Sequence, residues 1–346
     1  MDERHIDVGR RKVGRGLPIF VVAELAGNHG GNLERALEMI DAAHRSGADA
    51  VKLQTFTADS MTLDSNRADF RLADGQTIHE MYARFETPWE WHSSLRDHAR
   101  DLGLELFSTP FSPDAVDHLE LMDSPMIKIA SFEIVDLPLI RHAASTGRPL
   151  AISTGMSTLS EIEDAVTTAR EYGSGGVILL KCTSTYPAVP EEMNLRTIPH
   201  LAQAFGVQVG LSDHSTGIAV PVAATALGIT MIEKHFTLSR ADGGPESGFA
   251  LEPAEFKAMV EAVRVAEQAL GTVHYGLTAK EQDTRMFRRS LYVVRDIAAG
   301  ETLSTENVRS IRPGHGLAPK ELDRIVGRSA AEDICAGTPL SWDLVS

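Results

Sequence analysis

Eight short apolar runs, spaced between residues 20 and 235, constrain the fold of this chain more than any other feature. Each run is rich in Val, Ile and Leu, and almost every one ends in a polar residue. Such runs are typical of strands buried on both faces, as in parallel sheets, although runs this short do not by themselves exclude buried helix. The runs are Phe20–Glu24, Ala50–Gln54, Leu104–Thr109, Met126–Ser131, Leu150–Thr154, Val177–Cys182, Val207–Ser212 and Met231–His235.

Helical patterns fill the gaps between these runs and follow the last one. Several end at a glycine, as at Gly47, Gly103 and Gly271, the residue that tolerates the left-handed conformation just past a helix. Eight alternations of strand and helix predict an α/β fold, a (β/α)8 TIM barrel over residues 15–272. The helical patterns cover Leu33–Ser46, Pro88–Leu102, Pro113–Met122, Leu137–Thr146, Leu159–Tyr172, Leu195–Phe205, Ala219–Leu227 and Pro253–Leu270.

Polar residues at the ends of the predicted strands are the first candidates for an active site. In a (β/α)8 barrel the active site forms at the carboxyl ends of the strands, so side chains from distant parts of the sequence meet there. We therefore look for chemistry among the residues that end the runs. They are Glu24, Lys52, Gln54, Thr109, Lys128, Ser131, Ser153, Ser212, His214 and His235.

The chain has 346 residues, whereas such a barrel takes about 250. Residues 273–287 are polar and turn-rich, which predicts a linker. Residues 288–346 alternate short strand patterns with turns at Gly300, Gly314 and Gly337, which predicts a small, mostly β domain. Domains this small bury limited core, so this one is expected to dock on the barrel mouth, with a solubilising appendage as the alternative.

Charge and composition exclude some partners. The formal net charge of −15 disfavours nucleic acid or an anionic membrane surface, because both normally bind a basic face. No stretch is long and apolar enough to span a bilayer, and residues 1–16 are charged without the apolar segment of a secretory signal. Cys182 and Cys335 need no disulfide and are expected to be small buried hydrophobes. A soluble protein of the reducing cytoplasm is therefore expected.

His214 and His235 follow or end adjacent predicted strands, so they are expected to face each other across the barrel mouth. Two neutral imidazoles with water and substrate oxygens suit Mn²⁺, Fe²⁺, Co²⁺ or Zn²⁺. Two histidines without a third ligand are a weak pattern, and the alternative is that both are hydrogen-bonded structural residues. Their position at two consecutive strand ends favours the metal site.

Lys52 and Lys128 interrupt otherwise apolar strands, where an unpaired ammonium would be costly. Each is a candidate Schiff-base nucleophile, but two lysines beside small hydroxyl residues favour an anion-binding role. The run Ser153–Ser157 is compatible with a phosphate cradle at a helix start and equally with ordinary helix capping.

Two carboxylates and one loop complete the candidates taken from the pattern itself. Glu24 and Glu133 lie near strand ends among apolar residues, as candidate acid–base groups or simply as ion-pair partners of the lysines. The segment 242–249 (DGGPESGF), just past the eighth strand, is long and flexible enough in composition to close over a substrate.

The order and spacing of several motifs resemble the sialic acid synthase family. These motifs include AELAGNHGGN, FSTPFSPDAVDHLE, IKIASFEI, ISTGMST, LKCTSTYP, GLSDHS and IEKHFT, and they run through the whole predicted barrel. The tail, VVRDIAAGETLSTENVRSIRPGHG, is similar to the C-terminal antifreeze-like (SAF) domain of that family. The resemblance implies a TIM barrel followed by a SAF domain over residues 288–346.

Within the family, the wording SFEIVDLPLI, TPWEWH and RADGGPESGFALEP is similar to the pseudaminic acid synthases. The resemblance implies condensation of phosphoenolpyruvate with 2,4-diacetamido-2,4,6-trideoxy-L-altrose, which releases phosphate and gives a nine-carbon acidic sugar. The alternatives are an N-acetylneuraminate or legionaminate synthase, which use other amino sugars, and a lysine Schiff-base pyruvate aldolase. Ser184, where neuraminate synthases carry Asn, and Glu246, where Asp is usual, leave the sugar open.

The resemblance also implies roles for individual residues. His214 and His235 would bind a divalent metal, with Mn²⁺ expected and Mg²⁺ or Co²⁺ as alternatives, and Glu24 would be the acid–base group for adding water. Arg312 would reach the barrel of a partner subunit, which implies a domain-swapped homodimer. Lys52, Lys128, Thr109, Ser131, Ser153 and Ser212 would hold phosphate and carboxylate, and Gln54, Glu133, Tyr186 and Glu246 would contact the sugar.

Overall fold

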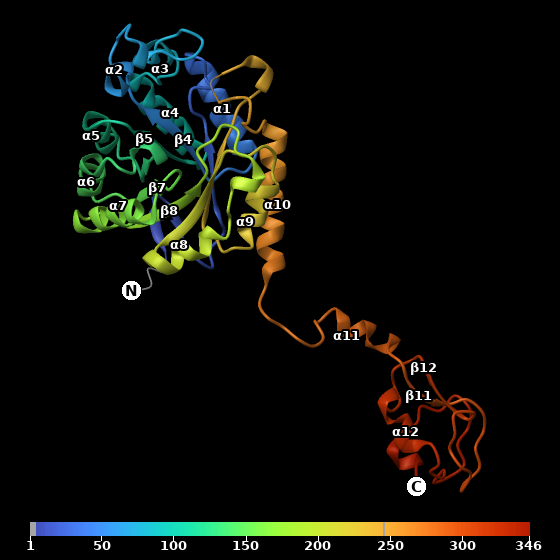
Figure 1. The fold of residues 1–346 in the computed structure, drawn as a ribbon. Helices are drawn as coiled ribbons and strands as arrows, with labels where there is room; N and C mark the ends of the chain where they lie inside the picture. The colour runs from blue at the N-terminus through green and yellow to red at the C-terminus, as the bar shows by residue number, and fades with distance from the viewer. Residues whose placement is uncertain (1–4, 245) are drawn as a thin grey trace. The chain divides into compact units, whose positions relative to one another are not determined.

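The computed structural model describes residues 5–244 and 246–346. Its first unit, which ends at Gly271, is a closed barrel of parallel strands in the order β10-β3-β4-β5-β6-β7-β8-β9, with helices on the outside (Figure 1). This confirms the predicted fold class. The strands are β3 (Phe20–Glu24), β4 (Ala50–Thr55), β5 (Glu105–Pro110), β6 (Ile127–Ile129), β7 (Leu150–Ser153), β8 (Val177–Cys182), β9 (Gln208–Asp213) and β10 (Met231–His235).

Several helices begin where the sequence supplies a capping side chain. Asn32, Ser112, Asp136 and Thr158 each accept a hydrogen bond from a backbone N–H in the first turn of the helix that follows. The helices are α1 (Leu33–Arg45), α2 (Ala58–Met61), α3 (Ile78–Ala83), α4 (His92–Asp101), α5 (Pro113–Leu121), α6 (Leu137–Ser145), α7 (Leu159–Glu171), α8 (Thr197–Phe205), α9 (Ala219–Thr225) and α10 (Pro253–Leu270).

Short 3₁₀ helices lie in the connections, and one changes the expected end of a strand. The fourth barrel strand stops at Ile129, and Ser131 lies in the following 3₁₀ turn rather than in the strand as predicted. The 3₁₀ helices of this unit are η1 (Ala68–Phe70), η2 (Trp89–Trp91), η3 (Ser131–Glu133), η4 (Pro190–Glu192) and η5 (Arg240–Asp242).

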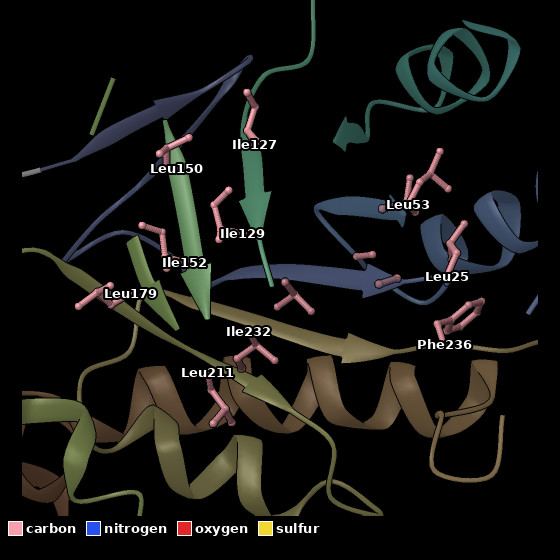
Figure 2. Close-up of a cluster of buried hydrophobic side chains, with 14 of the residues drawn as sticks. Leu25, Leu53, Ile127, Ile129, Leu150, Ile152, Leu179, Leu211, Ile232 and Phe236 are labelled. Atoms are coloured by element: carbon pink, nitrogen blue, oxygen red, sulfur yellow. The ribbon is translucent and has the colours of Figure 1, made fainter. Parts of the chain in front are cut away.

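Successive residues of each strand face opposite sides of the barrel wall, which gives the barrel two apolar layers. One set, which includes Leu53 and Ile152, packs outward against the helices, as Figure 2 shows for Leu211 and Ile232. The other set fills the interior toward the amino-terminal ends of the strands and includes Phe20, Ala50, Met126, Ile178 and Met231. Because the period is two, the residues that continue the interior rows toward the carboxyl ends are the polar ones.

The charged start of the chain contains a hairpin that its sequence pattern does not predict. Strands β1 (Ile6–Val8) and β2 (Arg11–Val13) pair antiparallel. Ile6, Val8 and Val13 are buried in the interior cluster, so the hairpin closes the amino-terminal end of the barrel. The prediction that residues 1–16 are not a secretory signal includes residues 1–4, which lie outside the described residues.

The second unit, Thr272–Ser346, has its own core. Strands β11 (Ser290–Val293) and β12 (Val308–Ile311) pair antiparallel, and Leu291, Val293 and Leu303 are fully buried. The segment predicted as a linker carries α11 and η6. The remaining elements of the unit are α11 (Glu281–Thr284), η6 (Arg285–Phe287), η7 (Pro319–Glu321), α12 (Leu322–Ile325) and η8 (Trp342–Leu344).

Two further expectations meet the structure here. Cys182 is buried, but the prediction that Cys335 is buried is wrong, because the neighbouring Ile334 enters the core and Cys335 is exposed. Over the described ranges, the structure contains no helix that is both long and apolar enough to cross a membrane.

Candidate active site

A cavity opens at the carboxyl ends of the barrel strands and gathers most of the predicted site residues. Every predicted residue lines it except Glu133 and Arg312. The predicted residues in the lining are Glu24, Lys52, Gln54, Thr109, Lys128, Ser131, Ser153, Tyr186, Ser212, His214, His235 and Glu246, and the lining also includes Phe111, Ala130, Phe132, Cys182 and Glu233.

The strand register explains why these side chains converge. His235 of β10 pairs with Glu24 of β3, and Glu24 pairs with Lys52 of β4, so three inward-facing residues stand side by side. Two residues before His235 on β10, and on the same face, Glu233 pairs with Ser212 of β9. Parallel strands that end at one level therefore place acid, base and imidazole groups in one polar layer above the apolar interior.

Glu24 and Lys52 form an ion pair of 2.5 Å inside this layer, and Lys52 also donates a hydrogen bond to Thr109 at 3.0 Å. Burial raises the pKa of Glu24 to about 7, because it outweighs the opposing attraction of Lys52, and the Glu233 carboxylate raises it further. Burial opposes the charge on Lys52, but the carboxylates Glu233 and Glu24 hold its pKa above the ordinary value. Glu24 can therefore change protonation near neutral pH beside a permanent cation.

Glu233 is a site residue that the sequence analysis missed. Its Oε1 lies 3.7 Å from the ammonium of Lys52 and 3.9 Å from that of Lys128, and it accepts a hydrogen bond from Ser212 at 3.2 Å. Burial would raise the pKa of Glu233, but Lys128 and Lys52 hold it below the ordinary value. Alternation from His235 along the strand would have identified it, because residues two apart share a face.

Lys128 is buried beside Glu233 and donates a hydrogen bond to the carbonyl of Ile129 at 3.1 Å. Burial lowers its pKa below the ordinary value, and Glu233 offsets this only in part. Next to it, Ser131 accepts a hydrogen bond from the backbone N–H of Gly155 at 3.0 Å. The buried hydroxyl of Ser153 has no hydrogen-bond partner within the described part of the chain. The ammonium of Lys128 and the hydroxyls of Ser131 and Ser153 thus form an anion-binding group in the cavity.

His214 and His235 face each other in the same cavity, with ring centroids 5.1 Å apart. The Nδ1 of His214 lies 3.0 Å from the carbonyl of Thr183, which can only accept, so this nitrogen carries a proton. In the neutral imidazole the lone pair of Nε2 is then free to accept a hydrogen bond or bind a metal. Burial holds the pKa of His235 well below the ordinary value, and His214 and Lys52 lower it further. His235 is therefore a neutral imidazole at physiological pH.

The residues around this pair fit a divalent metal that takes two imidazoles from the protein. The buried Nδ1 of His235 lies 3.4 Å from Oε2 of Glu246, and neither atom has a hydrogen-bond partner among residues 5–244 and 246–346. Within those residues no group of three or more His, Cys, Asp and Glu side chains is arranged to hold a metal. A metal held by the two imidazoles would therefore need further ligands from outside the described residues.

Cys182 lies behind His214, with Sγ 3.7 Å from Nδ1. Burial would raise the pKa of this thiol, but the hydrogen bond to His214 lowers it, with a net value of about 7. The same contact counters the effect of burial on His214, whose pKa is raised above the ordinary value. Cys182 is buried as expected, but it also makes a polar contact with His214 that the expectation of a small hydrophobe did not include.

Aromatic rings and the segment after β10 close the imidazole side. The ring of Tyr186 lies 4.5 Å from that of His214, and Phe249 lies 4.9 Å from His235. Glu246, from the segment predicted to cover a substrate, reaches the cavity, and burial raises the pKa of its carboxyl group. Pro245 of the same segment lies outside the described residues. This side of the cavity combines carboxylate, imidazole and ring faces, which suits a polar organic molecule such as a sugar.

Two predicted residues lie away from the lining. Glu133 is in η3, two residues after Ser131, where burial raises its pKa to about 7 against the opposing effect of Lys128. Arg312 follows β12 in the second unit, where it is exposed.

Comparison with known proteins agrees with this fold. A model of the NeuB family matches residues 39–275, and a model of the SAF domain matches residues 288–346. A pseudaminic acid synthase from Campylobacter jejuni is 44% identical over 93% of this chain and 95% of its own length. An N,N'-diacetyllegionaminic acid synthase from Legionella pneumophila is 38% identical over 97% of both chains.

A solved structure shares the whole architecture. The crystal structure of the spore coat polysaccharide biosynthesis protein SpsE from Bacillus subtilis matches 99% of both chains at 35% identity, with a TM-score of 0.69. The resemblance to sialic acid synthases is thereby confirmed. This chain belongs to the NeuB family and carries a C-terminal SAF domain.

Proposed function

We propose that this chain catalyses the reaction of a pseudaminic acid synthase, a transferase reaction that forms a carbon–carbon bond between phosphoenolpyruvate and 2,4-diacetamido-2,4,6-trideoxy-L-altrose and releases phosphate. The observation that carries the proposal is a single cavity that gathers buried lysines and hydroxyls together with paired imidazoles and aromatic rings. The choice of sugar is supported by the relatives, since the pseudaminic acid synthase is the more similar of the two compared.

The lysines and hydroxyls of the cavity would hold phosphoenolpyruvate. Lys128 and Lys52 would neutralise phosphate and carboxylate, and the unpaired hydroxyl of Ser153 together with Ser131 and Ser212 would complete the hydrogen bonds. Glu233, held between both lysines, keeps their ammonium groups in place before substrate arrives. Fixing the nucleophilic carbon close to the sugar aldehyde lowers the entropic cost of the bimolecular step.

The imidazole pair and its neighbours would hold the open-chain sugar, with Gln54, Tyr186, Glu246 and Glu133 among its contacts. His214 and His235 would hold a divalent metal, with Mn²⁺ as the proposed ion. Such an ion supplies Lewis acidity toward a carbonyl oxygen. Glu24, whose pKa is raised to about 7 by burial, would take the proton from the water that adds to carbon 2 of the former phosphoenolpyruvate. Collapse of that adduct expels phosphate.

The quaternary arrangement and location are also part of the proposal. A domain-swapped homodimer would place the exposed Arg312 of one subunit at the sugar end of its partner's barrel. Both substrates are small polar molecules, and the formal net charge of −15 disfavours nucleic acid or an anionic membrane surface as a partner. A cytoplasmic enzyme acting on soluble metabolites fits these properties.

The test is phosphate release from phosphoenolpyruvate, measured with each candidate sugar in metal-free buffer and again with added Mn²⁺. Release with the altrose derivative and not with N-acetylmannosamine or its 4-acetamido-6-deoxy analogue is the expected result. Release only with a mannose-configured sugar would keep the reaction and overturn the sugar. Borohydride trapping of pyruvate on Lys128, with no effect of chelators, would replace the proposal by an aldolase.

A further inference from the structure

A fully buried ion pair lies directly behind the two histidines. Lys234 of β10 and Asp213 of β9 are paired in the strand register, and each immediately precedes a histidine of the site, His235 and His214. Their side chains point outward, opposite to Glu233 and Ser212. The Nζ of Lys234 lies 2.5 Å from Oδ2 of Asp213, and both side chains have zero exposed surface.

The same two side chains also fix the backbone that carries His214. Lys234 donates a second hydrogen bond to the carbonyl of Ser215. Oδ1 of Asp213 accepts a hydrogen bond from the N–H of Ser215 at 2.9 Å. Asp213, His214 and Ser215 are thereby tied at both ends to one residue of β10, the neighbour of His235. The ion pair therefore connects the backbone segments of the two imidazoles.

Stability alone gives no reason to keep a charged pair here. The outer face of these strands is apolar, with Leu211 and Ile232 in the cluster that packs against the helices. Taking two charges out of water is expensive, and well-packed apolar residues in place of a buried pair are often as stable or more stable. A pair retained at such a position is better explained by the geometry that it imposes, because two hydrogen-bonded charges tolerate less displacement than apolar contacts.

We propose that Lys234 and Asp213 are positioning residues that set the distance and orientation of His214 relative to His235 for metal binding. This rests on the proposed function, which requires a metal at the two imidazoles. Because the protein supplies only two ligands, metal affinity depends strongly on the position of each imidazole ring. Residues behind the ligands therefore control affinity, and loss of such support typically weakens metal binding about 10- to 100-fold.

The test uses the double variant Lys234→Met/Asp213→Asn. It removes both charges together, leaves no unpaired buried charge, and keeps an oxygen to accept the hydrogen bond from Ser215. The matched control is Glu105→Gln, which removes the Arg10–Glu105 ion pair of 3.1 Å at the other end of the barrel, away from the histidines. Binding of Mn²⁺ to metal-free full-length protein is measured directly by electron paramagnetic resonance of the free ion.

The expected result is a Kd for Mn²⁺ that rises about 10- to 100-fold in the double variant and less than about twofold in Glu105→Gln. At saturating phosphoenolpyruvate, kcat should fall in the double variant and recover with excess Mn²⁺, while the KM for phosphoenolpyruvate stays within about twofold. Unchanged Mn²⁺ affinity with a lowered melting temperature would overturn the proposal and leave the pair a structural one.

Mn²⁺ binding to the wild-type protein tests the metal role separately from the positioning role that rests on it. If wild-type protein binds no Mn²⁺, both the metal role and the positioning role are overturned. If it binds Mn²⁺ and the double variant binds equally well, only the positioning role is overturned. Should the double variant fail to fold, the charge-retaining single variant Lys234→Arg decides, because it alters the geometry of the pair without leaving a buried charge unpaired. A raised Kd for Mn²⁺ is expected, and an unchanged Kd would overturn the positioning role.

Discussion

The carboxylate of Glu24 lies 2.5 Å from the ammonium of Lys52 inside the barrel, where the side chains are 1% and 5% exposed. The pair joins the first two strands of the barrel at the level of the site. Because burial raises the pKa of Glu24 to about 7 even beside this cation, the pair can exchange a proton with water near physiological pH. Four predictions follow the chemistry outward from this contact.

Activity should depend on the ionised form of Glu24. A base with a pKa of about 7 is lost as the pH falls, so kcat should drop about tenfold per pH unit below pH 7 and level off above it. Glu24→Gln should lower kcat by about 10²- to 10⁴-fold and remove this acid limb. The measurement is phosphate release from pH 5.5 to 9, and an acid limb that survives in Glu24→Gln would assign it to another group.

Glu133→Gln should stabilise the protein at alkaline pH. The folded protein holds this proton up to about pH 7, whereas the ordinary pKa of a glutamate is 4.5, so unfolding releases a proton between those values. Stability therefore falls as the pH rises through this window, and the penalty is complete above about pH 7. The variant should gain about 1–3 kcal/mol at pH 8 and nothing at pH 4.

The control for this prediction is Glu163→Gln on α7, where the side chain is exposed. Thermal unfolding of the barrel unit at pH 4 and pH 8 provides the measurement. An equal gain at both pH values would show that the effect comes from packing and not from the proton.

Gly155→Ala should weaken binding of phosphoenolpyruvate, because it displaces hydroxyl groups beside the cavity. A Cβ at this position would lie 2.1 Å from the hydroxyl of Ser184 and 2.7 Å from that of Ser131, which binds the Gly155 N–H. Displacement of these side chains should raise the KM for phosphoenolpyruvate about 10- to 100-fold, as expected for overpacking worth about 1–3 kcal/mol. Gly248→Ala, with open space at its Cβ, is the matched control. Unchanged kinetics in Gly155→Ala would remove Ser131 from the substrate site.

Arg312→Ala should raise the KM for the sugar at least about tenfold and leave the KM for phosphoenolpyruvate unchanged, because loss of a charge-assisted hydrogen bond to a substrate costs about 1.5–3 kcal/mol. Arg309→Ala, an exposed arginine on β12, is the matched control. Mixing Arg312→Ala with His235→Ala subunits should restore activity, since a mixed dimer contains one intact barrel and one intact arginine. No recovery in subunits shown to exchange would contradict delivery of Arg312 to a partner.

The elements of the fold could be predicted because their causes are local. Val177–Cys182 and Met231–His235 are strands with the predicted bounds, and Pro253–Leu270 is a helix with the predicted bounds. Each combines a run of suitable propensity with flanking residues that end it. The hairpin of Ile6–Val8 and Arg11–Val13 could not be predicted in this way, because its few apolar residues gain their burial from the barrel interior and not from each other.

The sequence by itself determined which side chains stand at strand ends, since alternation and strand length are properties of one segment. Only the tertiary structure decided which of these side chains meet. The contacts of Glu233 with Lys52 and Lys128, and of Lys234 with Asp213, depend on the stagger between strands and on closure of β10 against β3. Charges that are far apart along the chain acquire their pKa values from that closure, because burial and neighbouring ions act through space.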